Sequence, residues 1–236
     1  MSTGDPEIHE QAIELAGENI SLHTGFRLAT TNPLAGGPIE IEFFIDNNGS
    51  SSFPLALVGD RSRQRPGKFS FTASLEGVTL EDPMAMMDHT GGPATVVEVL
   101  PGSSWRQLLV LGEFIRLEDS LAVLGQNTTG RMKLVCRRPL ILASTKAAAL
   151  SGKEVRTVAA DLVFDLLRND QALTTLAAEL MKAVMDGPQD QRERPLSLLL
   201  AMRTAAHNQI EGLTHHPDRF VIMRAKYAIS TFRNEG

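Results

Sequence analysis

Hydrophobic and polar residues alternate along much of the first two thirds of the chain, and this pattern predicts β-strands. In residues 39–46 every odd position is apolar, whereas Glu40, Glu42 and Asp46 occupy the opposite face. Residues 68–75 repeat the alternation, with phenylalanine, alanine and leucine on one face and lysine, serine and threonine on the other. Such half-buried alternation is typical of an antiparallel sheet with one solvated face. Further strands are predicted at residues 21–30, 53–58, 94–100, 104–111, 130–137 and 140–144.

Turn-forming runs such as Gly36-Gly37-Pro38 and Arg65-Pro66-Gly67 separate these strands at short intervals. Many short strands punctuated this often favour a sandwich or a barrel. We therefore predict a mainly β fold with additional helices, in which residues 20–166 form an antiparallel β-sandwich. The sandwich is immunoglobulin-like by architecture only, because the Cys-Trp-Cys core of true immunoglobulin domains is absent.

Three stretches carry a helical or a mixed pattern. Within the N-terminal segment 1–19, a short helix is predicted over residues 5–17, with Asp5 as its N-cap and Gly17 at its end. Residues 115–124 place leucines at helical spacing and are expected to cross from one sheet to the other. Residues 153–168 fit both a strand and one face of a helix, and we favour a last strand that runs directly into the helical part.

Helical spacing dominates the C-terminal segment, residues 167–236, which is predicted to hold a small bundle of about three helices. Asn169 or Asp170 caps the first helix, Pro195 opens the second, and the third follows Pro217. Their apolar faces are Leu173, Leu176, Ala177, Leu180, Met181 and Val184; Leu199, Met202, Ala206 and Ile210; and Val221, Ala225, Ile229 and Phe232. Because three short helices bury little surface alone, we expect them to pack on the sandwich or on a partner.

Charge and cysteine content limit the partners that the chain can have. A net charge of −5 provides no basic field for nucleic acid, so no nucleic-acid binding is predicted. The one basic concentration is interpreted as the solvated side of a strand: Arg131, Lys133, Arg137 and Arg138. Cys136 is the only cysteine, and its alternation with Met132 and Leu134 predicts an inward-facing, inert thiol.

No apolar run approaches the ~18 residues that span a bilayer, and the first residues lack the features of a signal peptide. The sequence as given therefore predicts a cytoplasmic protein without membrane insertion. A removed leader, and with it an envelope or virion location, stays open as an alternative.

Two clusters carry side chains that bind metals, although no site is assigned to either. The first is Met84, Met86, Met87 and His89, where thioether and imidazole groups suit copper, and where methionines filling an open end of the core are the simpler interpretation. The second is His207, His215 and His216, which would suit zinc or nickel. The simpler interpretation here is a solvated turn and a His207 at a helix C-terminus, where the helix dipole favours a cation.

Glycine patterns that bind phosphate and nucleophile-elbow motifs are absent, so no catalytic residue and no cofactor is predicted. Three classes of function remain. We favour a non-enzymatic protein-interaction or structural module, whose C-terminal helices bind a partner or a second copy. The alternatives are a metal-binding β-sandwich, holding copper or zinc, and an enzyme whose residues converge only in three dimensions.

Overall fold

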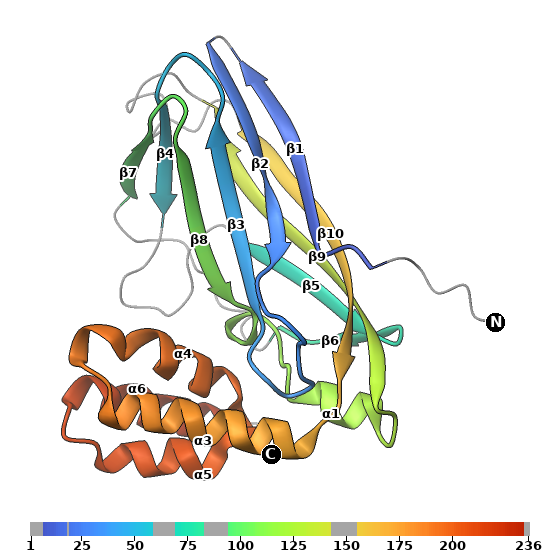
Figure 1. Ribbon diagram of the computed structural model, residues 1–236, viewed down its shortest axis with the longest axis vertical. Helices are drawn as coiled ribbons and strands as arrows, with labels where there is room; N and C mark the ends of the chain where they lie inside the picture. Colours follow the sequence, from blue (N-terminus) through green and yellow to red (C-terminus); the bar gives the residue numbers. More distant parts are fainter. Residues whose placement is uncertain (1–6, 18, 59–68, 83–93, 143–154, 234–236) are drawn as a thin grey trace.

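The computed structural model describes residues 7–17, 19–58, 69–82, 94–142 and 155–233 and shows a mixed fold with antiparallel sheets and helices (Figure 1). The strands are β1 (Glu10–Gly17), β2 (Ile20–Leu28), β3 (Glu40–Asn47), β4 (Phe53–Val58), β5 (Ser70–Leu75), β6 (Val78–Leu80), β7 (Ala94–Val99), β8 (Ser104–Val110), β9 (Thr129–Ile141) and β10 (Val155–Leu167). The helices are α1 (Asp119–Leu124), α3 (Asp170–Asp186), α4 (Glu193–Ala201), α5 (His207–Gly212) and α6 (Arg219–Arg233). Short 3-10 turns lie at η1 (Leu111–Glu113), η2 (Gln189–Gln191), η3 (Arg203–Ala206) and η4 (Leu213–His215).

Two four-stranded sheets, in the orders β1-β2-β3-β8 and β10-β9-β5-β6, enclose a common hydrophobic core, and β4 pairs with β7 in a separate ribbon (Figure 1). Aromatic side chains join the two sheets. Phe26 and Phe43 of the first sheet contact Phe69, which directly precedes β5, at ring-centroid distances of 6.2 and 5.4 Å. The described strands that neighbour one another in these sheets pair antiparallel, as the alternating pattern predicts.

Strand β3 shows how alternating apolar and polar residues are divided between the inner and the outer face of the sheet. Ile41, Phe43 and Ile45 are fully buried between the sheets, whereas Glu42 and Asp46 lie on the outer face. A shift of the register by one residue would exchange these two sets, so the burial of one face fixes the pairing of β3 with β2 and β8. The predicted orientation of residues 39–46 is confirmed.

Residues 153–168 contain a strand, β10, as we favoured, and it pairs along its whole length with β9. The two strands predicted at 130–137 and 140–144 are wrong in one respect, because a single strand of 13 residues covers 129–141. Pro139 does not interrupt it. Strand β5 pairs with β9 only as far as Arg137, so among the described strands Pro139 has a paired neighbour on one side only.

The helix predicted over residues 5–17 is wrong, because residues 10–17 form β1. This strand pairs with β2 from Glu10 opposite Arg27 to Gly17 opposite Ile20. Asn19 adopts a left-handed φ of 61° in the tight turn that joins them. Local helical signals were outweighed by a partner strand close by in the sequence, because pairing satisfies the backbone of the whole segment. Residues 1–6 lie outside the described part of the chain.

The expectation that the basic cluster lies on the solvated side of a strand is wrong for Arg138. Arg138 is only 2% exposed, and its guanidinium carbon lies 4.1 Å from the ring centroid of Phe69 and 5.2 Å from that of Phe43. Alternation along β9 explains this position, since Cys136 and Arg138 share the inner face whereas Arg137 is exposed. Burial lowers the pKa of Arg138 to about 10.

The predicted inward orientation of Cys136 is confirmed, because the thiol is buried in the core. Burial raises its pKa, and the nearby charge of Asp161 raises it further. The thiol is therefore held in its unreactive, protonated form.

Four α-helices, α3 to α6, gather at one end of the sheets and share a second hydrophobic core (Figure 1). The predicted cap of the first helix is confirmed, because the side chain of Asn169 accepts a hydrogen bond from the amide of Ala172. The single helix expected after Pro195 is instead divided into α4 and α5, since η3 intervenes and Arg203 has a φ of +45°. None of the described helices is long and apolar enough to cross a bilayer.

Close packing and ion pairs attach the helices to the sheets. Gly112 approaches α4 so closely that a β-carbon there would lie 2.8 Å from that of Ala201. Arg194 of α4 donates two hydrogen bonds, of 3.0 and 2.7 Å, to the carboxylate of Glu40 in β3. These contacts hold α4 against the end of the sheets, and α6 packs with the other helices around the helical core (Figure 1).

Candidate interaction surface

Helix α6 carries apolar side chains on its outer side. Phe220, Met223 and Tyr227 are 46%, 56% and 50% exposed, respectively. Their spacing of three and four residues aligns them on one face of the helix. Arg219 and Lys226 are also exposed and flank this row on one side. We call these five side chains the α6 surface.

The opposite face of the same helix is committed to the helical core, where Val221 and Ala225 are buried. The start of the helix is fixed by Asp218, whose carboxylate accepts a hydrogen bond of 2.8 Å from the amide of Phe220. The inner face was predicted from the sequence, but the outer row was missed. Its signal was a second set of large apolar residues at helical spacing, in a helix that needs only one such face.

Positive charge accumulates on α6, which has four basic residues and no acidic residue: Arg219, Arg224, Lys226 and Arg233. Arg224 is partly buried: its guanidinium carbon lies 5.6 Å from the Phe220 ring centroid, and it donates a hydrogen bond of 3.5 Å to the hydroxyl of Ser197 in α4. Burial lowers the pKa of Arg224, and the charges of Glu113 and Glu193 oppose that shift. By contrast, Arg219 and Lys226 form no ion pair with any residue that the structure describes.

A cleft of about 170 Å³ adjoins the α6 surface beside Phe220. Its lining is largely polar and acidic: Gln189, Asp190, Arg192, Glu193, Leu196, Asp218, Phe220 and Val221. The volume is below the roughly 300–1,000 Å³ typical of small-molecule sites. The cleft has the size to receive a side chain of a protein partner.

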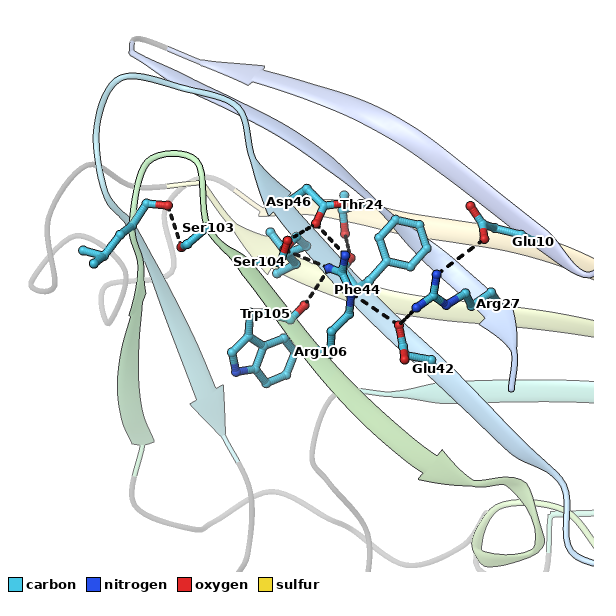
Figure 2. A network of polar contacts seen from close by, with 12 residues as sticks. Glu10, Thr24, Arg27, Glu42, Phe44, Asp46, Ser103, Ser104, Trp105 and Arg106 are labelled. Carbon is cyan, nitrogen blue, oxygen red and sulfur yellow. Dashed lines mark hydrogen bonds and ion pairs between the residues drawn. The ribbon is translucent and has the colours of Figure 1, made fainter. Parts of the chain in front are cut away.

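A second polar feature covers the outer face of the first sheet (Figure 2). Its ion pairs run across four strands in the order Glu10, Arg27, Glu42, Arg106, Asp46, with separations of 3.9, 2.6, 3.4 and 2.7 Å. Ser104 donates a hydrogen bond to Asp46. Burial by itself raises the pKa of Asp46, but the hydrogen bonds from Ser104 and Arg106 and the charge of Arg106 lower it below its ordinary value.

Phe44 lies at the centre of this outer network, between two guanidinium groups (Figure 2). The guanidinium carbon of Arg106 is 5.2 Å from the ring centroid, and that of Arg27 is 5.7 Å from it. The His23 ring also contacts the Phe44 ring, at a centroid distance of 5.6 Å. The charged side chains thus cover an outward-facing aromatic ring and pair with one another, so the network stabilises the register of the sheet.

The histidines considered as zinc or nickel ligands occupy different environments. His215 is exposed, whereas His216 is buried and its Nδ1 accepts a hydrogen bond from the amide of Asp218. His207 is the first residue of α5 and not the last of a helix, which corrects its expected position. Within the described ranges, no group of three histidine, cysteine, aspartate or glutamate residues lies close enough to hold a metal ion. The methionine cluster with His89 lies outside those ranges.

Comparisons with known proteins give little guidance. No family model matches the chain, and no curated protein matches it. Among solved structures, the chain is similar to a protein from Archaeoglobus fulgidus, with a TM-score of 0.31 and 12% sequence identity. The alignment covers 64% of this chain and 97% of that protein. A similarity at this level carries no argument about function.

Proposed function

We propose that the protein is a non-enzymatic interaction module, in which a β-sandwich holds a helical docking segment and α6 contacts a protein partner. The observation that carries this proposal is the α6 surface, where three large apolar side chains in a row are each about half exposed. Aromatic residues and methionine are enriched at protein interfaces, and contiguous exposed apolar surface is uncommon without a role.

The sheet part supports this proposal as a scaffold. We propose that the sandwich is immunoglobulin-like in its architecture only. In its first sheet, β1, β2 and β3 are neighbours in the order in which they occur in the sequence. A rigid sheet with a filled core, joined to the helices through Gly112 and the Glu40–Arg194 ion pair, would keep α6 fixed in one orientation. A preformed surface of this kind loses little conformational entropy on binding.

The experiment is site-specific photo-crosslinking in the cells in which the protein occurs. A photoreactive amino acid replaces Met223 in the full-length chain, and a second version carries it at Val155, a strand residue of similar exposure. We expect a discrete protein adduct at position 223 that is absent at position 155. The adduct should be lost when Phe220→Ser and Tyr227→Ser are added, because both changes remove apolar contact area from the same row.

A matched control carries Val78→Ser and Val155→Ser, which remove exposed apolar side chains from strands. This control should keep the adduct at position 223. Equal adduct formation at both probe positions, or an adduct that persists without Phe220 and Tyr227, would refute the proposed function. Circular dichroism of each variant verifies that the fold is retained.

A further inference from the structure

The two basic residues of the α6 surface indicate what kind of partner this surface fits. Arg219 and Lys226 lie seven residues apart, which places them two turns from each other along the same edge of the apolar row. The distance along the helix is therefore about 10 Å. Both cations are exposed and form no ion pair with the described residues, so they are available to a bound partner.

The other edge of the apolar row has the opposite character. Phe220 and Val221 line the cleft there, together with the acidic residues Asp190, Glu193 and Asp218 and with Arg192, which lies 4.0 Å from the Asp218 carboxylate and leaves the lining net acidic. The α6 surface together with the adjoining cleft thus has a basic edge, an apolar centre and an acidic edge. A complementary partner has carboxylates on one side of an apolar row, and neutral or basic groups on the other.

We propose that the α6 surface binds an amphipathic segment of another protein. The acidic residues of that segment lie against Arg219 and Lys226, and its apolar residues lie on Phe220, Met223 and Tyr227. This inference rests on the proposed function and adds the chemistry of the partner. The geometry corresponds to an amphipathic helix binding along an apolar row, in which anchors recur at helical spacing. One anchor side chain enters the cleft beside Phe220.

Two other occupants fit the surface less well. A second copy that paired α6 with α6 antiparallel would set Arg219 and Lys226 against the same basic residues of the other copy, and a parallel pair would bring only Arg219 near the acidic cleft of the other copy. An anionic bilayer would attract the basic edge, but it would also meet Asp190, Glu193 and Asp218 around the cleft. A protein segment can arrange both signs of charge, whereas a uniformly anionic surface cannot.

The test uses the photoreactive residue at position 223 in the full-length chain and identifies the attached segment by mass spectrometry. We expect a segment of a different protein whose flanking residues, over the length of α6, contain more Asp and Glu than Lys and Arg. The double variant Arg219→Glu, Lys226→Glu should lower the adduct yield by about tenfold, because two attractive charge contacts become repulsive.

The control variant, Arg137→Glu with Lys182→Glu, reverses two exposed cations elsewhere and should leave the yield unchanged. An adduct with a second copy of this chain, with a net basic segment or with a lipid would overturn the inference. So would an adduct whose yield is unaffected by the reversal of Arg219 and Lys226. Complete absence of an adduct at position 223 would instead refute the proposed function, so the two failures are distinguishable.

Discussion

The ion pair between Arg194 and Glu40 should measurably stabilise the contact of the helices with the sheet. The two hydrogen bonds of 3.0 and 2.7 Å form a bidentate contact. The side chain of Glu40 is 12% exposed and that of Arg194 is 64% exposed. The partners thus differ greatly in their access to water. The hydrogen bond and charge of Glu40 raise the pKa of Arg194, so its guanidinium stays charged.

An exposed ion pair contributes about 0–1 kcal/mol, whereas a hydrogen bond to a buried charged group contributes about 1.5–3 kcal/mol. Arg194→Ala leaves the nearly buried Glu40 carboxylate without two charge-assisted hydrogen bonds, although water can reach it from the Arg194 side. We therefore expect a loss of about 1–2 kcal/mol in the free energy of unfolding. A double-mutant cycle with Glu40→Gln should give a coupling energy of about 1 kcal/mol that decreases at high salt.

Urea unfolding followed with two probes would measure this effect. Fluorescence of the single tryptophan, Trp105 in β8, reports on the first sheet, and circular dichroism at 222 nm reports mainly on the helices. Arg219→Ala is the control, since Arg219 is an exposed arginine without an ion pair to the described residues and should change stability by less than about 0.5 kcal/mol. A coupling energy below about 0.3 kcal/mol would contradict the argument.

Three further predictions follow from single sites. Asn169→Ala should destabilise α3 by about 1 kcal/mol in urea unfolding, whereas Asn169→Asp should retain most of the cap; equal losses for the two variants would contradict the capping role. Asp46 has a lowered pKa in the folded state, so its stabilising contribution is present above about pH 4 and is lost as the pH falls through its folded pKa. Asp46→Asn should therefore reduce stability at neutral pH, with a difference from the natural chain that shrinks in acid denaturation; a constant difference would argue against the linkage. Cys136 should react with a thiol reagent only after unfolding, because the thiol is buried and its pKa is raised; rapid modification of the folded chain would disprove this.

The sequence by itself determined the elements in which one face is apolar. The orientation of β3, the inward position of Cys136 and the cap at Asn169 follow from side-chain chemistry within a few residues, and local periodicity reports such features directly. The inner face of α6 could be predicted for the same reason.

Tertiary structure decided the remaining features, because they depend on contacts between different segments, which the periodicity within one segment does not report. Residues 10–17 form a strand only because β2 is available to pair with them. Arg138 is buried because its alternation is shared with Cys136, and because Phe43 and Phe69 from two other segments face its guanidinium. The exposure of the α6 surface likewise depends on packing, because α6 carries a second row of apolar residues and the other helices leave that row uncovered.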